Sequence, residues 1–399
     1  MKHFDYESSA RKNKIFFKEP ENFTKYTDKE TLSYALGATL YMPATKTSIA
    51  QDIIGRKYTE LTSMVIDLED AVGDNQLEEA ERMLFEHLRV LYEALEDQIL
   101  LVDDLPLIFV RVRNPEQLRQ VTAQLSIYQR VLTGYVFPKF SYETGKKYLA
   151  ILEEQNDKDI VLYGMPILET AEVIYKETRM SALLSIKHLL DAHKHLILNV
   201  RIGATDFCGL FGIRRNVDTT IYDVALIRDC LTDILNVFNR QENGYVISGP
   251  VWEFFLKEER VFKPKLRMTP FRDRYGRMGI EKRNEMINHY IDGLINEVLL
   301  DKLNGIVGKT IIHPTHIKPV HASYTVTHEE YVDALSILAN SEGQVGVLKS
   351  QYDNKMNEMK PHLYWAKRMM LQAKIFGVYH EDQDFTSLLV ENQLHEVKS

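Results

Sequence analysis

Hydrophobic residues recur along this chain in eight short runs, and each run ends in a polar, glycine or proline turn. The runs occupy residues 38–42, 64–66, 106–110, 134–137, 160–163, 196–200, 245–248 and 310–314. Most are followed by a segment with helical periodicity, such as 76–95 or 220–240. A continuous apolar run of this length is typical of a strand that is buried on both faces. Strands that alternate with helices predict a parallel sheet.

Eight such units over roughly 280 residues match the size of a (β/α)8 TIM barrel, which typically takes about 250 residues. A doubly wound open sheet is the alternative, but no G-x-G-x-x-G turn follows the first strand. We therefore predict an α/β chain with a TIM barrel over residues 31–325. In such a barrel, the polar residues that follow the strands converge on one face.

Three segments fall outside this rhythm. Residues 1–30 are polar with scattered aromatic residues, and they predict an N-terminal extension that is at best partly ordered. Residues 326–399 predict a C-terminal helical appendage with a loose acidic tail. Residues 251–300 lengthen the seventh unit, and 257–283 within them carry ten Lys or Arg against four Asp or Glu. This basic insertion indicates either a phosphate-binding patch or a solvated loop of mixed charge.

Composition narrows the class of protein. Of the 399 residues, 45% are hydrophobic and 27% charged, as in ordinary globular proteins. The formal net charge of −8 argues against general nucleic-acid binding. No apolar run approaches the ~20 residues that span a bilayer, and the charged N-terminus lacks the apolar core of a signal peptide. Cys208 and Cys230 are the only cysteines, which excludes a disulfide framework. We expect a cytoplasmic protein without a membrane segment.

Two carboxylates follow successive predicted strands, Glu169 after the fifth and Asp206 after the sixth. They would be neighbours on one rim of the barrel. Such a pair can hold Mg²⁺, which takes oxygen ligands, is usually bound by one or two carboxylates and keeps several waters. The ion would then polarise a substrate carbonyl. For Asp206, which follows Gly203 in a polar turn, capping of the next helix is the alternative.

Charged residues also follow the second and third predicted strands. Arg111 and Arg113 lie two residues apart, hence on the same face of a strand. A guanidinium there can take a substrate carboxylate in a bidentate grip. The group Asp67, Glu69 and Asp70 allows two interpretations, which are direct catalysis and internal ion pairs with those arginines.

Two further motifs resemble ligand-binding sites only in part. His313 and His316 are three residues apart, and two histidines at this spacing can bind the same metal ion when they lie on a helix. Pro314 argues against a helix there, and the sequence has no HExxH motif. The stretch from Gly305 to Thr310 resembles the end of a P-loop. It lacks the first glycine of that motif, and a strand rather than a helix follows. Neither motif predicts a zinc or ATP site.

Six motifs in register resemble the citrate lyase beta-subunit / malyl-CoA lyase superfamily, also called HpcH/HpaI-type aldolases. They are VIDLEDAV at 65–72, VRV at 110–112, FPK at 137–139, ILET at 167–170, GATD at 203–206 and GKTIIHP at 308–314. They follow the family's order over residues 36–320. The branch that the chain most resembles is the TIM-barrel C–C bond lyase group associated with bacterial tellurite-resistance and stress operons.

The resemblance implies a Mg²⁺-dependent barrel in which Glu169 and Asp206 are the metal ligands. It implies that Arg111 binds the carboxylate of an oxoacid. The residues that we assign to substrate binding beside it are Arg113, Lys139 and Thr205. At position 113 the family usually has asparagine, so the polarity of the pocket is expected to differ here.

The resemblance also implies an acyl carrier and a C-terminal acid. Lys309, His313 and Pro314 fall where relatives contact the carrier, usually coenzyme A. Relatives carry a C-terminal Met-Ile-Asp-x-Pro-like motif whose acid reaches an active site, often in the next subunit. Here the nearest match is residues 356–361, with Glu358 in place of the aspartate.

We predict a Mg²⁺-dependent carbon–carbon lyase that acts beside the carbonyl of a small oxo- or hydroxy-carboxylic acid or its acyl-CoA thioester. Arg111, Glu358 and the acids at 67, 69 and 70 are the candidate catalytic residues. The family favours a homo-oligomer, a trimer or a hexamer. The alternative is a non-catalytic binding or regulatory protein of a stress-response system, and failure to bind Mg²⁺ would favour it. In a third interpretation, the basic insertion binds a phosphorylated ligand or RNA while the barrel stays catalytic.

Overall fold

The chain divides into two units. The computed structural model describes residues 1–156, 160–255, 289–340 and 346–389. The first unit comprises Met1, Phe23–Glu253 and Asn296–Ile317, and the second unit comprises the remaining residues. The basic insertion at 257–283 lies outside the described residues, so both interpretations of it stay predictions.

The first unit is built on a barrel of eight parallel strands. They are β2 (Ala38–Pro43), β3 (Ser63–Asp67), β4 (Leu107–Arg111), β5 (Gly134–Phe137), β6 (Tyr163–Leu168), β7 (Val200–Ile202), β8 (Ile247–Ser248) and β9 (Lys309–Ile311). The strand order is β8-β7-β6-β5-β4-β3-β2-β9, and every neighbouring pair is parallel. A parallel bridge between Gly249 and Lys309 brings the two ends of the sheet together. The predicted TIM barrel is confirmed.

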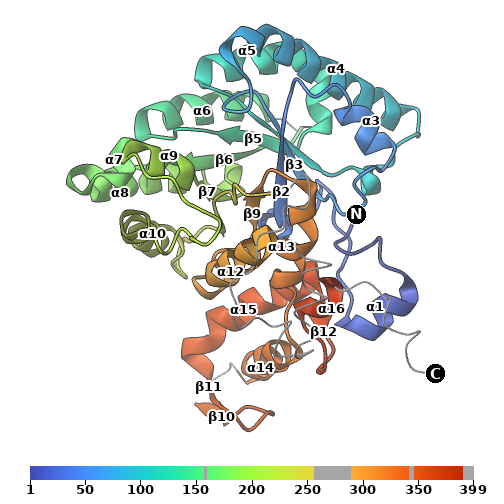
Figure 1. Cartoon of the computed structure of the whole chain (residues 1–399), viewed down its shortest axis with the longest axis vertical. Coiled ribbons are helices and arrows are strands. Elements are labelled where there is room, and N and C mark those ends of the chain that lie inside the picture. The colour runs from blue at the N-terminus through green and yellow to red at the C-terminus, as the bar shows by residue number, and fades with distance from the viewer. Residues whose placement is uncertain (157–159, 256–288, 341–345, 390–399) are drawn as a thin grey trace. The chain divides into compact units, whose positions relative to one another are not determined.

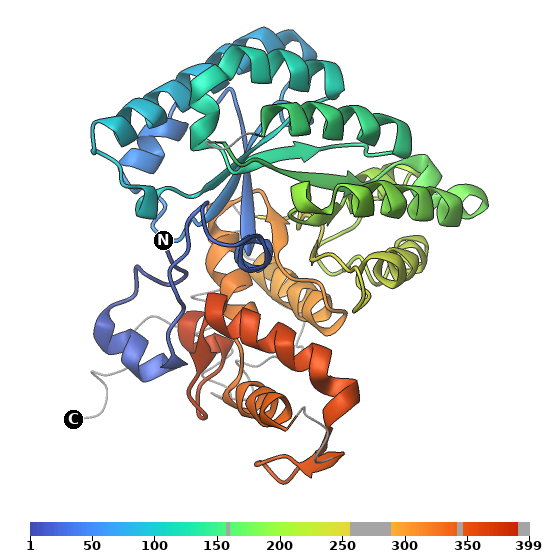
Figure 2. The same cartoon turned by 180° about the vertical axis from the view of Figure 1, so that it is seen from behind.

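Helices cover the outside of this sheet, as two opposite views of the chain show (Figure 1 and Figure 2). They are α2 (Lys29–Ala35), α3 (Ile49–Ile54), α4 (Leu77–Glu96), α5 (Pro115–Leu125), α6 (Tyr142–Gln155), α7 (Ala171–Ile174), α8 (Lys176–Ala192), α9 (Ala204–Leu210), α10 (Ala225–Phe238) and α12 (His289–Leu303). The predicted helix at 76–95 is α4, and the one at 220–240 appears as the shorter α10.

Local chemistry explains why these elements form. Strands β3 and β4 are buried at every position, as strands between a barrel interior and a helix layer must be. Helix α4 buries Leu84, Leu88 and Leu91, whose spacing of four and three residues makes one apolar stripe. Helix α5 begins at Pro115, whose missing N–H costs nothing in a first turn.

The fifth strand lies later in the chain than the sequence predicts. The prediction placed it at the apolar run 160–163, and a proline such as Pro166 is uncommon inside a sheet because it cannot donate to the ladder. Strand β6 instead runs over Tyr163–Leu168, and Pro166 stays in register opposite Phe137 of β5. The pairing along the neighbouring strand therefore overrides the local preference of the proline.

The sixth strand is also displaced. Of the apolar run at 196–200, Leu196 ends a 3-10 turn and Ile197 makes a single bridge to Gly164. Regular pairing begins only at β7 and includes Arg201, which lies opposite Ile167 of β6. The shift brings a cationic residue into a strand of the barrel.

The second unit contains residues from near the N-terminus, Lys2–Asn22, together with the C-terminal part of the chain. Its elements are α1 (Ser9–Ile15), β1 (Phe16–Lys18), α13 (Ile317–Tyr324), α14 (His328–Ala339), β10 (Val347–Lys349), β11 (Met356–Glu358), α15 (Met359–Phe376), β12 (Val378–Tyr379) and α16 (Phe385–Leu389). Helices α14 and α15 lie within the segment 326–399 that the sequence predicts to be helical. The expectation of little N-terminal order is wrong, because β1 pairs antiparallel with β12 and Phe16 packs beside Tyr379.

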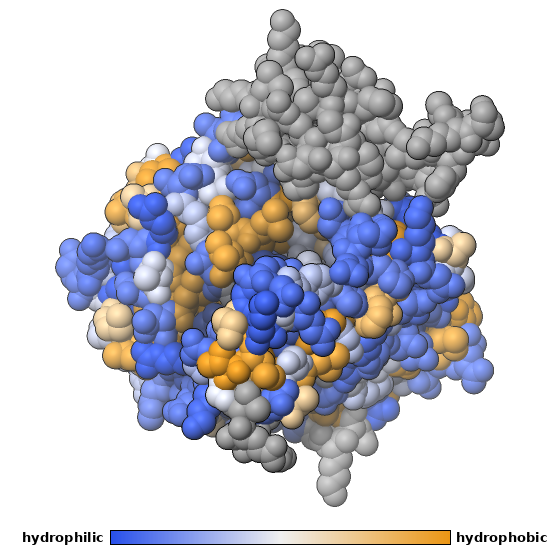
Figure 3. Space-filling view, turned by 90° about the horizontal axis from the view of Figure 1, so that it is seen from below, coloured by the Kyte–Doolittle hydropathy of each residue, from blue (hydrophilic) through white to orange (hydrophobic). Residues whose placement is uncertain are grey.

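The surface carries hydrophobic residues in small groups. On the face that Figure 3 shows, they lie among a larger number of hydrophilic residues. A folded protein leaves much apolar surface exposed, so such groups by themselves indicate no partner. In the described parts of the chain, no helix combines the length and apolar character that crossing a membrane requires.

Candidate active site

Glu169 and Asp206 meet at one rim of the barrel. Glu169 follows the last residue of β6, and Asp206 lies in the first turn of α9, directly after β7. Glu169 is only 4% exposed, and its Oε1 accepts the backbone N–H of Lys139 at 2.7 Å. Its carboxyl shares a hydrogen bond with Asp206, which is partly exposed.

Burial raises the pKa of Glu169 to about 8, and the neighbouring Asp206 adds to the shift. Burial likewise raises the pKa of Asp206, with a further contribution from Asp70. In both cases removal from water is the largest cause and a neighbouring carboxylate adds to it, whereas the hydrogen bond with Glu169 acts to lower the pKa of Asp206. A cation bound between Glu169 and Asp206 would oppose both shifts.

Gly203 makes this arrangement possible. A Cβ atom at position 203 would lie 2.1 Å from Oε2 of Glu169, closer than real atoms approach. The glycine between β7 and α9 therefore leaves the space that the Glu169 carboxyl occupies. This explains in physical terms why the turn of the GATD motif begins with a residue that has no side chain.

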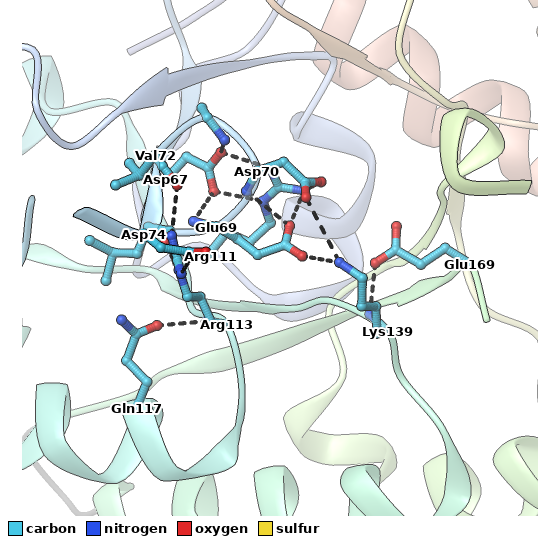
Figure 4. A network of polar contacts seen from close by, with 12 residues as sticks. Asp67, Glu69, Asp70, Val72, Asp74, Arg111, Arg113, Gln117, Lys139 and Glu169 are labelled. Atoms are coloured by element: carbon cyan, nitrogen blue, oxygen red, sulfur yellow. Dashed lines mark hydrogen bonds and ion pairs between the residues drawn. The ribbon is translucent and has the colours of Figure 1, made fainter. Parts of the chain in front are cut away.

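A charge network next to this pair is centred on Arg111, the last residue of β4 (Figure 4). Its Nε and Nη2 each donate to Asp67 at 2.7 Å, and its Nη1 lies 2.9 Å from Glu69 and 3.3 Å from Asp70. Although burial opposes its charge, the hydrogen bonds to Asp67 raise the pKa of Arg111. The interpretation of these acids as ion-pair partners of Arg111 is confirmed.

Lys139 joins the two groups. Its ammonium contacts Glu69 and lies 3.8 Å from Asp70, while its backbone N–H holds Glu169. Its φ of 47° is the left-handed conformation that non-glycine residues seldom adopt. Strain of this kind persists where surrounding contacts over-determine the backbone, and it is concentrated at functional sites.

Negative charge exceeds positive charge at this rim. We call the following residues the rim network: Asp67, Glu69, Asp70, Arg111, Lys139, Glu169 and Asp206. It contains five carboxyl groups and two cations. Within the described ranges, no three Asp, Glu, His or Cys residues form a ready metal cage. Two carboxylates are, however, what Mg²⁺ commonly takes from a protein, with waters and substrate oxygens completing its octahedron.

The comparisons with known proteins agree with the barrel. A family model described as C–C bond lyase of the TIM-barrel fold matches residues 30–378. This chain belongs to that family. The protein is therefore a carbon–carbon lyase, as the motifs predicted, and we call it the lyase from here on. Its association with tellurite-resistance or stress operons stays a prediction.

Solved structures share the fold of the lyase. The protein CitE of Mycobacterium tuberculosis, solved with magnesium, acetoacetate and coenzyme A, is 18% identical, with a TM-score of 0.53 over 86% of this chain and 99% of CitE. A citrate lyase of Burkholderia xenovorans LB400 is 14% identical, with a TM-score of 0.56 over 89% of this chain and 96% of that one. No curated protein sequence matches the lyase.

Two predicted substrate contacts of the lyase are occupied by other groups. The Nε and Nη2 edge of Arg111 is bound to Asp67, which contradicts a bidentate grip on a substrate through that edge. Arg113 lies beyond the end of β4, so the alternation of a strand does not apply to it. Its side chain donates to the carbonyls of Leu68 and Val72, away from Glu169 in Figure 4. It holds the loop after β3 rather than a ligand.

The prediction that Lys309 contacts an acyl carrier is also contradicted. Its side chain is fully buried and donates to Glu297 at 2.9 Å and Asp301 at 2.8 Å. Arg215 donates to the other oxygen of Glu297 at 2.6 Å, and Tyr222 donates to Asp301 at 2.8 Å. We call Arg215, Glu297, Asp301 and Lys309 the buried anchor, because each of its charges is paired within the fold.

The remaining predicted residues keep their roles as predictions. Thr205 is exposed in α9 and contacts Glu253, whereas His313 and Pro314 begin the short turn after β9. The Nδ1 of His313 lies 2.8 Å from Thr315, and burial lowers the pKa of its imidazole. Glu358 ends β11 in the second unit and is exposed.

The sequence analysis missed Arg201. It lies within β7 and is 1% exposed, although arginine is among the residues that proteins bury least. A signal was present, since an arginine stands between Val200 and Ile202, two residues before Gly203. Because the predicted strand ended at Val200 and the turn began at Gly203, this arginine was given no role.

Proposed function

We propose that this lyase uses Mg²⁺, held by Glu169 and Asp206, to cleave or form a carbon–carbon bond in a small oxo- or hydroxy-carboxylic acid. The observation that carries the proposal is the pair itself. A buried carboxyl with a pKa of about 8 shares a hydrogen bond with a second carboxyl at the rim of the barrel. Active sites of TIM-barrel enzymes lie at this end of the strands.

The chain's own residues supply the setting for this chemistry. Bound Mg²⁺ would act as a Lewis acid on the carbonyl oxygen of the substrate. The backbone N–H of Lys139 orients Glu169, and Gly203 leaves room for its carboxyl. The rim network supplies the excess of negative charge that a divalent cation neutralises. Arg111 keeps Asp67 and Glu69 in place, and the substrate then needs a different cation for its carboxylate.

The relatives support the substrate class. CitE of Mycobacterium tuberculosis was solved with magnesium, acetoacetate and coenzyme A, which joins this fold with a divalent cation, an oxoacid and an acyl carrier. For this lyase we propose the acid either free or as its coenzyme A thioester. Because Lys309 is buried, a carrier would have to be held by other residues.

The test is Mg²⁺-dependent turnover on malyl-CoA, citramalyl-CoA and free hydroxy acids, together with calorimetric titration of Mg²⁺. We expect Glu169→Gln and Asp206→Asn to abolish turnover and to weaken Mg²⁺ binding at least about 100-fold, since each removes a direct charged ligand. Glu143→Gln, at a 76% exposed carboxylate of α6, is the control and should retain both. If Mg²⁺ binds equally well to all three variants and no substrate turns over, the proposal is wrong.

A further inference from the structure

Arg201 is a buried guanidinium that meets no carboxylate among the described residues. Its Nη2 donates to the hydroxyl of Thr310 at 2.8 Å, and its Nη1 faces only the sulfur of Met165 at 4.0 Å. Its Nε has no hydrogen-bond partner within the described ranges. A guanidinium carries five N–H donors in a planar fork. Most of that capacity is therefore unused.

The surroundings make this charge more unfavourable still. The ring of Tyr41 lies next to two guanidiniums, with the Cζ of Arg201 at 5.7 Å and the Cζ of Arg111 at 5.2 Å from its centroid. The aromatic face offsets part of the cost of burying a cation. Burial nevertheless lowers the pKa of Arg201, and the charge of Arg111 acts in the same direction, whereas Tyr41, through its charge and a side-chain hydrogen bond, acts against both.

The other buried cations of the first unit differ from Arg201. Arg111 pairs with Asp67, Arg179 with Asp229, Arg215 with Glu297 and Lys309 with Asp301. Among the buried Lys and Arg side chains of the described residues, only Arg201 has no such carboxylate. A buried cation is ordinarily retained only when it is paired. The missing anion is therefore expected to come from outside the described residues, and a ligand is the candidate that we pursue.

We propose that Arg201 binds the carboxylate of the substrate acid. The inference rests on the proposed function and extends it to the residue that recognises the acid. Arg201 pairs with Ile167 of β6, two residues before Glu169, which places it one layer below the carboxylate pair. Thr310, which accepts its hydrogen bond, is partly exposed, whereas the hydroxyl of Tyr41 beside it is buried.

This assignment also resolves the difficulty with Arg111. The guanidinium predicted to grip the substrate is already bound to Asp67 through Nε and Nη2. Arg201, by contrast, has Nε without a partner and Nη1 against a sulfur only. A planar guanidinium suits a carboxylate better than an ammonium does, because it can donate two parallel hydrogen bonds. The ligand class is a small acid whose carboxylate enters the barrel beneath a metal-bound carbonyl.

The experiment measures binding and stability in the same variants. Pyruvate, acetoacetate, oxaloacetate and L-malate are titrated into the Mg²⁺-loaded lyase and into Arg201→Met. We expect the variant to lose at least about 30-fold in affinity for the acids that the wild type binds, because a charged hydrogen-bonded pair is lost. Its affinity for Mg²⁺ should stay within about twofold. Without ligand its melting temperature should be equal or higher, since an unpaired buried charge has been removed.

Two controls separate recognition from structure. Thr310→Val removes only a neutral partner of Arg201 and should change acid affinity by no more than about threefold. Arg119→Met, at a 61% exposed arginine of α5, should change nothing. Unchanged acid affinity in Arg201→Met would overturn the inference and make Arg201 a structural residue. If that variant does not fold, Arg201→Lys keeps the charge without the fork, and full affinity in it would overturn the inference as well.

The two proposals fail in different ways. If the wild type binds no Mg²⁺, the proposed function fails, and metal-free titration of the four acids still tests Arg201. If the wild type binds Mg²⁺ but none of the acids, the inference about Arg201 is overturned while the metal site stands.

Discussion

The buried anchor and the rim network are both clusters of charge in the first unit, but only one of them is balanced. The anchor sets Arg215 and Lys309 against Glu297 and Asp301, and both carboxylates and both cations are within hydrogen-bond distance of a partner. The rim network has two cations for five carboxyl groups, and the carboxyl of Glu169 resists ionisation. Equal numbers of positive and negative charges indicate a structural role. An excess of carboxyl groups indicates a site that can bind a cation.

Exposure separates the two clusters in the same way. Side chains of the anchor are 0–1% exposed. In the rim network Asp67, Glu69 and Arg111 are 1–10% exposed, whereas Asp70 and Lys139 are 56% and 53% exposed and open the network to solvent. Charges that never meet solvent must be paired within the fold. Charges at a rim can change partners when a ligand arrives. The comparison therefore predicts that changes in the anchor affect folding, whereas changes at the rim affect metal binding.

Breaking the anchor should have the largest effect. Lys309→Met leaves Glu297 and Asp301 with one cation between them, and removing one partner of a buried pair costs about 3–5 kcal/mol. We expect the free energy of unfolding, measured in urea, to fall by that amount. Lys309→Met combined with Asp301→Asn restores the charge balance and should recover part of the loss. Lys147→Met, at a 65% exposed side chain, is the matched control and should leave stability unchanged.

The comparison would fail if Lys309→Met unfolded at the same urea concentration as the wild type. It would also fail if the folded variant lost Mg²⁺ binding as strongly as Glu169→Gln does, because the anchor would then be part of the site.

Filling the space beside Glu169 should have the second largest effect, which is weaker binding of Mg²⁺. In Gly203→Ala, the new Cβ would lie 2.1 Å from Oε2 of Glu169, so that carboxyl must move. We expect Mg²⁺ affinity to fall by about 10- to 100-fold, as when support of a metal ligand is lost. Gly209→Ala, in the same helix α9 with nothing within 4 Å of its new Cβ, is the control. Equal Mg²⁺ affinity in both variants would contradict the placement of the metal.

The pH dependence of metal binding should be smaller. A proton on Glu169, whose pKa is raised to about 8, competes with Mg²⁺. The affinity for Mg²⁺ should therefore increase with pH, by up to about tenfold for each unit until pH 8, and should be constant above pH 8. Calorimetry in two buffers of different ionisation enthalpy should show proton release on binding at pH 7. Affinity that is constant from pH 6 to 8, without proton release, would show that Glu169 is not a ligand.

The smallest effect should come from the outermost ion pair beside the rim network. Asp74 contacts Arg113 but is 97% exposed, and pairs of this kind contribute little because water screens them. We expect Asp74→Asn to leave the unfolding midpoint, Mg²⁺ affinity and turnover within experimental error. A clear loss of turnover would show that the loop held by Arg113 is part of the active site.

The sequence by itself determined the architecture and the meeting of Glu169 and Asp206, the proposed metal ligands, at one rim. Eight alternating units specify a parallel barrel, because strands joined through helices must run in the same direction. Parallel strands bring their carboxyl ends to one rim, so Glu169 and Asp206 had to meet once each followed its strand. Both inferences depend only on the local periodicity of hydrophobic residues and on the order of strands and helices. Both features can be obtained from one amino-acid sequence.

Only the tertiary structure decided which charge pairs with which. Arg111 meets Asp67 across 44 residues, and Arg201 meets Thr310 across 109. Lys309 could be read as a ligand contact until its side chain proved to pair with Glu297 and Asp301 in the core. Arg201 was missed because side chains alternate along a strand, and a small error in where a strand lies changes which residues face inward. Partners and faces depend on register between distant strands, and no local pattern encodes that register.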